Sequence, residues 1–175
     1  AERASGLVWE QLWEQKIGKP LGLTDTAWVP VDPRHIPKLS GGARSSLRDY
    51  AKFLEMLSNN GTCRGKRILS PEAVKEMGRD QLNGAAVPKD VFVEAYCGGK
   101  HPGIYGLGHW RESEDARGNV LIESSPGWAG TYPWIDRGRG LYAVLVAHKN
   151  QIRLNAMYAG SALPRLVGKI VDSAR

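Results

Sequence analysis

Cysteine is scarce in this sequence and long hydrophobic runs are missing from it, and each absence excludes a class of protein. The 175 residues contain two cysteines, Cys63 and Cys97, whose separation and neighbours match neither a metal-binding knuckle nor a redox pair. We interpret them as unpaired or buried thiols, because cysteine prefers burial, although one disulfide between them stays open. The longest clear apolar run, residues 141–147, is strand-sized and far below the roughly 18 residues of a membrane-spanning helix. We therefore predict no membrane span.

Charge of one sign is not concentrated anywhere along the chain. The formal net charge is +6, which alone would permit binding to nucleic acid or to an acidic surface. The lysines and arginines are nevertheless scattered, and their densest group, Arg64, Lys66 and Arg67, lies in a predicted turn. We interpret this group as part of a solvated loop and predict no nucleic-acid partner.

Signals for metal binding and for secretion are also missing. The histidines stand singly, without the spacing between ligands that zinc sites show, at His35, His101, His109 and His148. We interpret them as surface or core histidines and expect no metal and no cofactor. Residues 1–6 hold no basic stretch followed by an apolar segment, so no signal peptide is visible. The cellular compartment is therefore left open at this point.

The first half of the chain carries helical patterns. Residues 7–17 place large apolar side chains, among them Trp9 and Trp13, at helical spacing. Gly18 and Pro20 are expected to end this helix. The following segment, up to Ser40, is rich in proline, aspartate and threonine and is expected to form an ordered loop.

Two further helices have clear start signals. Ser46 can cap a helix by accepting a hydrogen bond from the backbone N–H near Asp49. An apolar stripe then continues to a stop at residues 59–61, Asn-Asn-Gly. A shorter helix is predicted over residues 71–77, with Ser70 as its cap and proline in its first position.

The second half of the chain changes from helical to extended patterns. Strands joined by short turns are predicted, as in an antiparallel meander, over residues 105–111, 120–124, 131–136 and 141–148. Residues 159–174 place their apolar side chains on one side of an amphipathic helix, which is expected to cover the sheet. The predicted class is α+β, an antiparallel β-sheet flanked by helices. Residues 1–175 are expected to form a single domain or part of one.

Five segments of the sequence match motifs of one protein family in order and at plausible spacing. They read KPLGLTDT, GGARSSLRDYAKF, RILSPE, YGLG and GWAGTYPWID, at residues 19–26, 41–53, 67–72, 105–108 and 127–136. The ordered set resembles the β-lactamase-related serine hydrolases, which include penicillin-binding proteins, class C β-lactamases and family VIII esterases. The resemblance implies that the chain is the C-terminal portion of the β-lactamase/transpeptidase-like fold. It also implies a periplasmic or secreted protein.

The nucleophile of this family is absent from the sequence. Its members use a Ser-x-x-Lys helix for nucleophile and general base, and a Tyr-x-Asn loop for proton transfer. No serine here has lysine three residues later, and no tyrosine has asparagine two residues later. In the family both motifs precede the segment that residues 19–26 resemble, so we expect the chain to begin after them. We expect no catalytic residue in it and no activity from the chain alone.

A third family motif lines the substrate cleft, and its place is taken here by Ser125, Pro126 and Gly127. The resemblance implies that this strand pairs with an extended ester, amide or peptide substrate and helps to form the oxyanion site. Trp128 is either a further wall of the cleft or a simple packing residue. Gly127 suits close approach of a ligand, whereas Ser125 offers no charge to a β-lactam carboxylate and Pro126 lacks an N–H donor. We therefore predict a neutral ester or amide substrate.

Two functions fit these observations. The chain is either the cleft-forming part of a serine hydrolase or a non-catalytic binding or assembly module that keeps the scaffold. The altered residues 125–127 and the missing nucleophile motivate the second. Ser124 and Ser125 are not expected to be nucleophiles, because neither lies in a Gly-x-Ser-x-Gly elbow and local main chain satisfies serine hydroxyls readily. An open sheet edge would be covered by the rest of the polypeptide or by a second copy of the chain.

Overall fold

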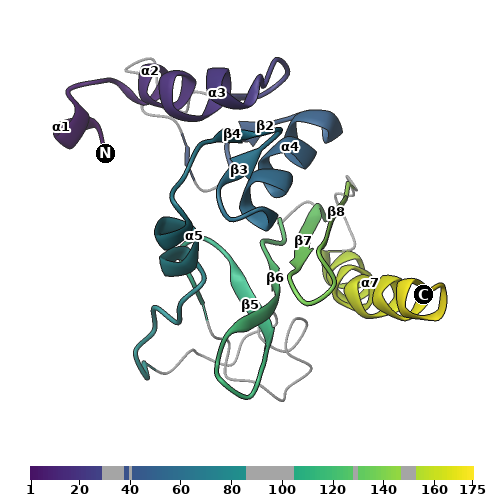
Figure 1. Ribbon diagram of the computed structural model, residues 1–175. Coiled ribbons are helices and arrows are strands. Elements are labelled where there is room, and N and C mark those ends of the chain that lie inside the picture. Colours follow the sequence, from purple (N-terminus) through teal and green to yellow (C-terminus); the bar gives the residue numbers. More distant parts are fainter. Residues whose placement is uncertain (29–37, 40, 86–104, 128–129, 147–152) are drawn as a thin grey trace. The chain divides into compact units, whose positions relative to one another are not determined.

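The computed structural model describes residues 1–28, 38–39, 41–85, 105–127, 130–146 and 153–175 (Figure 1). The chain divides into two compact units, Ala1–Ser70 and Pro71–Arg175. The first unit is mainly helical with two short strand pairs, and the second combines an antiparallel sheet with helices. The predicted α+β class is therefore confirmed. No helix within the described ranges combines the length and the apolar character needed to cross a membrane.

The helical segment at the start of the first unit runs further than the sequence predicted. It comprises α1 (Glu2–Ser5), α2 (Trp9–Trp13), a π-helical turn η1 (Glu14–Gly18) and α3 (Lys19–Leu21). The predicted stop at Gly18 and Pro20 was wrong. The wider π turn resets the hydrogen-bond ladder, and Pro20 falls in the first turn of α3, where a missing N–H costs little. The helical path ends instead at Gly22, whose φ of 63° is left-handed.

Two tryptophans of this helical segment pack against a third tryptophan from the strand that follows it. The rings of Trp9 and Trp13 stack with centroids 6.3 Å apart. Trp28 meets both rings edge-on, at 5.2 Å and 5.5 Å. Trp28 belongs to strand β1 (Ala27–Trp28), which pairs antiparallel with β2 (Ala43–Arg44). The predicted loop after the helix thus contains a two-residue strand, which is too short to leave a periodic signal in the sequence.

Helix α4 (Leu47–Ser58) is the central element of the first unit and confirms the predicted cap. The Ser46 hydroxyl accepts from the backbone N–H of Asp49 at 3.2 Å. The helix ends at Asn59, and a hairpin of β3 (Thr62–Cys63) and β4 (Lys66–Arg67) follows. Buried side chains of α3, α4 and β3 form one apolar core, made of Leu21, Met56 and Cys63. Cys63 is a free thiol, and burial raises its pKa; Cys97 lies outside the described residues.

The second unit begins with the short helix α5 (Pro71–Met77), whose bounds agree with the prediction. Its sheet is an antiparallel meander in the order β5-β6-β7-β8 (Figure 1). The strands are β5 (Trp110–Glu114), β6 (Val120–Ser124), β7 (Tyr132–Asp136) and β8 (Leu141–Leu145). Three of them lie where the sequence placed them, although residues 147 and 148 of the last predicted strand lie outside the described part.

The first predicted strand, residues 105–111, was wrong over most of its length. Strand β5 starts at Trp110, and the residues before it form a turn. The N–H of Gly106 donates to the carbonyl of His109 at 2.9 Å, and Gly108 has a left-handed φ of 88°. Gly108 makes this reversal possible, because side-chain-bearing residues rarely adopt such a φ.

Helix α7 (Arg153–Ser173) runs alongside β7 and β8 (Figure 1). Its side chains Leu163 and Val167 pack against Tyr132 and Trp134 of β7, which are the buried centre of this unit. The helix approaches the sheet closely at Gly160, where an added Cβ would lie 2.3 Å from the ring of Tyr132. The prediction that a terminal amphipathic helix covers the sheet is confirmed.

Candidate functional site

The predicted site residues Ser125, Pro126 and Gly127 directly follow β6 and extend its pairing with the β7 side. The N–H of Ser125 donates to the Pro133 carbonyl at 3.3 Å, and the N–H of Gly127 donates to the Thr131 carbonyl at 2.7 Å. The backbone of this segment is therefore held in an extended form along one edge. Trp128, the fourth predicted site residue, lies outside the described residues.

The other edge of the same segment has a different environment. Strand β5 starts at Trp110, which pairs with Ser124, so β5 does not continue alongside residues 125–127. Backbone groups of successive residues in a strand point to opposite edges. Pro126 therefore directs its carbonyl oxygen toward the edge away from β7, where it contributes an acceptor and no N–H donor.

Gly127 leaves space above the strand. A Cβ built on it would meet only Thr131 among the described residues, at 3.6 Å or more, which is ordinary van der Waals contact. Its φ is not left-handed, so the backbone does not demand glycine either. The fold of the described residues thus gives no steric reason for glycine at this position.

The serine hydroxyls at the end of β6 are both engaged. Ser125 is exposed, and its hydroxyl donates to the carbonyl of Gly108 at 3.1 Å. The buried Ser124 donates to the carboxylate of Glu112 on β5. Neither hydroxyl bonds to a histidine or lysine in these contacts.

A buried carboxyl group behind the strand end was missed by the sequence analysis. Glu112 accepts hydrogen bonds from Ser124 and from the hydroxyl of Tyr132, which is 1% exposed. Burial raises the pKa of Glu112, and the two hydroxyl groups offset this in part. The group ties β5, β6 and β7 together on the face that α7 covers.

A second buried cluster lies on the opposite face of β6. The Nε2 atom of His109 lies 3.2 Å from Oε2 of Glu123, and an Arg137 nitrogen lies 2.5 Å from Oε1 of the same carboxylate. Burial lowers the pKa of His109 despite the neighbouring carboxylate, and the charges of Arg137 and Arg111 lower it further. His109 is the core histidine that the sequence analysis allowed, but its acidic neighbour was not foreseen.

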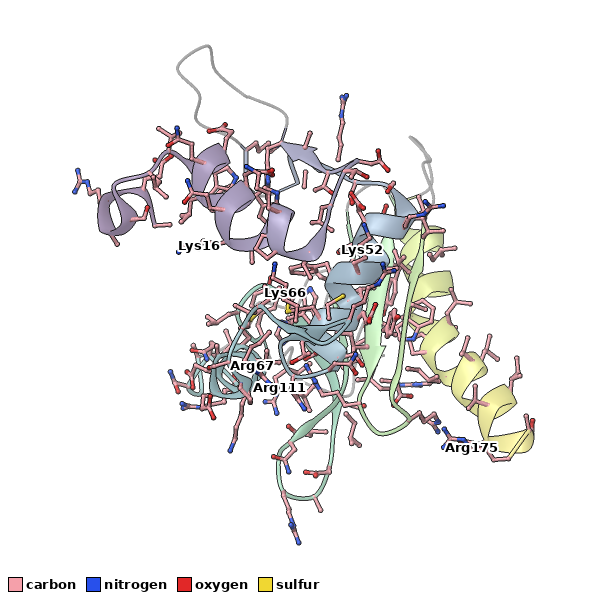
Figure 2. The ribbon with its side chains drawn as sticks, turned by 45° about the horizontal axis from the view of Figure 1, so that its top comes forward. Lys16, Lys52, Lys66, Arg67, Arg111 and Arg175 are labelled. Carbon is pink, nitrogen blue, oxygen red and sulfur yellow. The ribbon has the colours of Figure 1, made fainter. Side chains whose placement is uncertain are left out.

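Arg111 of β5, labelled in Figure 2, is nearly buried, and its guanidinium group has polar partners of its own. Its guanidinium lies 3.2 Å from the carboxylate of Glu114 and 2.6 Å from the carbonyl of Gly118. Within the described part of the chain, no group of three or more histidine, cysteine, aspartate or glutamate side chains is arranged to hold a metal ion. The other three histidines lie outside it.

Comparison with known proteins extends these observations. A family model described as Beta-lactamase matches residues 1–160. Protein Rv1367c of Mycobacterium tuberculosis (strain ATCC 25618 / H37Rv) is 31% identical over an alignment of 153 residues, which covers 71% of this chain and 37% of that protein.

Two solved structures are also similar. A protein of Bacteroides dorei DSM 17855, described as a candidate beta-lactamase, is 40% identical with a TM-score of 0.85, over 98% of this chain and 54% of that one. A Bacillus anthracis protein, described as a candidate 6-aminohexanoate-dimer hydrolase, shares the fold with a TM-score of 0.67 at 18% identity, over 94% of this chain and 39% of that one. The chain thus spans about half or less of the length of these relatives.

Proposed function

The chain belongs to the beta-lactamase family, and from this premise we propose that the complete protein is a serine hydrolase. It cleaves an ester or amide bond through an acyl-enzyme, and the attacking serine belongs to a part of the polypeptide other than residues 1–175. The observation that carries the proposal is the family match, and the extended segment 125–127, which we assign to the family's substrate strand, supports it. In this chain no serine is followed by lysine at the third position.

The role proposed for residues 125–127 is to pair with the substrate. Their N–H groups at Ser125 and Gly127 bond to the β7 side, which holds the segment extended while its other edge carries the Pro126 carbonyl. An extended substrate can align along such an edge by donating an N–H to this carbonyl, from the scissile amide itself or from an amide beside the scissile ester. The absence of a side chain at Gly127 lets the substrate lie close to the backbone.

We propose that the part of the substrate that binds along residues 125–127 carries no charge. Ser125 supplies a hydroxyl that already bonds to Gly108, rather than a cation that would attract a carboxylate. The nearby guanidinium groups of Arg111 and Arg137 contact the carboxylates of Glu114 and Glu123. Among the described residues, a substrate carboxylate at this strand would therefore lose hydration without gaining a dedicated positive partner.

Ser125→Lys in the full-length protein tests the proposal and its specificity together. We expect the wild type to hydrolyse a neutral activated ester faster than an analogue that carries a carboxylate. A hydrogen bond to a charged group contributes about 1.5–3 kcal/mol, so the lysine should shift the ratio of the two kcat/KM values toward the acidic analogue by about 10- to 100-fold. Initial rates of hydrolysis of the two esters, measured at low and at high salt, give this ratio of kcat/KM values.

The matched control is Ser125→Met, which adds similar length without charge and should not shift the ratio toward the acidic analogue. A wild-type protein that hydrolyses neither ester would contradict the proposed activity. It would favour the alternative of a non-catalytic module, motivated by the missing nucleophile. A wild type that prefers the acidic analogue would leave the activity standing and refute the neutral substrate.

A further inference from the structure

We propose that His109 is a positioning residue: its imidazole fixes the turn of residues 105–108 against the end of β6 and thereby sets the placement of the substrate strand 125–127. This inference rests on the proposed function, because it assigns a role to His109 in substrate binding at that strand. His109 touches neither the reacting atoms nor the substrate in this account, and it acts through the turn.

Two contacts join the turn to β6 on the same face of the strand. Glu123 and Ser125 are two residues apart, so their side chains share one face. The carboxylate of Glu123 contacts Nε2 of His109 at 3.2 Å. The hydroxyl of Ser125 donates to the carbonyl of Gly108 at 3.1 Å. A displacement of the turn would therefore be felt directly at Ser125, the first residue of the proposed substrate strand.

The imidazole is packed directly against the turn. A Cβ built on Gly106 would lie 2.3 Å from the carbonyl oxygen of Met77 and 2.8 Å from Nε2 of His109, so the backbone of α5 and the imidazole together leave room only for glycine. The turn is fixed on its other side as well, because the N–H of Leu107 donates to the carbonyl of Met77 in α5 at 2.9 Å. Removing the imidazole would open a space between Gly106 and Glu123 into which the turn could relax.

Burial lowers the pKa of His109 and so favours the neutral ring, although the carboxylate of Glu123 and a hydrogen bond with the Leu107 backbone raise it. The groups that face it are Glu123 on β6, Arg137 after β7 and Arg111 on β5, and burial together with the two arginines outweighs the carboxylate. Nε2 of His109 and Oε2 of Glu123 are both buried and lack a hydrogen-bond partner within the described residues. These two atoms are thus close, but their geometry is poor for a hydrogen bond. Protonation of the ring would turn this contact into an ion pair.

The test compares His109→Ala and His109→Gln in the full-length protein. A misplaced substrate strand weakens ground-state and transition-state binding alike, so His109→Ala should raise KM for the neutral ester about tenfold and change kcat by less than about threefold. His109→Gln, which keeps a polar group of similar length, should recover most of the loss. In the wild type KM should also rise as the pH falls below the usual imidazole range, and in His109→Gln this rise should be absent.

Val74→Ala serves as the control for simple destabilisation, since Val74 is buried in α5. A purely structural loss lowers the folded fraction, which reduces the apparent kcat and leaves KM unchanged. An active wild type together with an unchanged KM in His109→Ala would overturn this inference and leave the proposed function intact. A wild type without any ester hydrolysis would overturn both.

Discussion

Gly127→Val in the full-length protein is expected to lower kcat/KM for a neutral activated ester about 100-fold, because a displacement of roughly 1 Å at a substrate contact costs that much. The free energy of unfolding should change by less than about 0.5 kcal/mol, as for surface sites that lack special contacts. The reason for the difference is local. The described residues leave space above Gly127, and its backbone conformation accepts a side chain. The added isopropyl group would occupy the space that we assign to the substrate.

Two further variants show whether the loss is caused by obstruction. Gly127→Ala should give a smaller loss than valine, because its single methyl group fills less of the same space. Gly138→Ala is the matched control, since a Cβ there would make contacts of 3.5 Å or more in an exposed turn. Full activity in Gly127→Val would contradict the assignment of residues 125–127 to the substrate strand. A loss of activity that merely follows a loss of stability would contradict it as well.

Asp49→Ala should lower the free energy of unfolding by about 3–5 kcal/mol, the cost of breaking a buried ion pair from one side. Asp49 is 1% exposed and accepts from the N–H of Asp25 at 2.7 Å, from the Thr26 hydroxyl at 3.1 Å and from Nζ of Lys52 at 3.0 Å. Lys52, labelled on α4 in Figure 2, also donates to the carbonyl of Gly22. Alanine would leave the N–H of Asp25 without this acceptor and would remove the carboxylate that neutralises Lys52. Urea unfolding of the full chain measures the change.

The same carboxylate predicts a dependence of stability on pH. Burial alone would raise the pKa of Asp49, but the hydrogen bonds from Asp25, Lys52 and Thr26 together hold it below the ordinary value of 3.8. A depressed pKa in the folded state contributes stability above the unfolded pKa, and this contribution is lost as the pH falls through the folded pKa. The stability difference between the wild type and Asp49→Asn should therefore shrink as the pH falls below about 4.

Arg48→Ala provides the control for Asp49, because Arg48 lies one residue earlier on α4 and is exposed. It should change the free energy of unfolding by less than about 0.5 kcal/mol. A difference between wild type and Asp49→Asn that stays constant from neutral to acid pH would show that the charge of Asp49 is not the stabilising feature.

The elements that local chemistry specifies were predictable from the sequence. The hydroxyl of Ser46 and the N–H of Asp49 are three residues apart, so the cap that starts α4 needs no knowledge of the tertiary fold. The same holds for Pro71 at the start of α5. Strands β6 and β7 are bounded by turn residues and carry apolar patterns, and they lie close to the predicted ranges.

The residues that the sequence did not reveal depend on strand register. Glu112 meets Ser124 and Tyr132 across three strands, and His109, in the turn before β5, meets Glu123 of β6. These meetings follow from a pairing that includes a register shift between Arg111 and Ser113. Such a shift changes which side chains share a face of the sheet, and the amino-acid pattern of the strand does not predict it. The assignment of residues 125–127, in contrast, depends on a family motif in the sequence and stays a prediction.

The proposed hydrolase activity depends most on where the attacking serine lies. Labelling of the full-length protein with a serine-directed fluorophosphonate locates this serine directly. The labelled peptide is identified by mass spectrometry after digestion. We expect one modified serine in the part of the polypeptide outside these 175 residues, with lysine three positions after it. We also expect labelling to slow in Gly127→Val and to be unchanged in Gly138→Ala. Modification of Ser124 or Ser125, or no modification of the folded protein at all, would contradict the proposal.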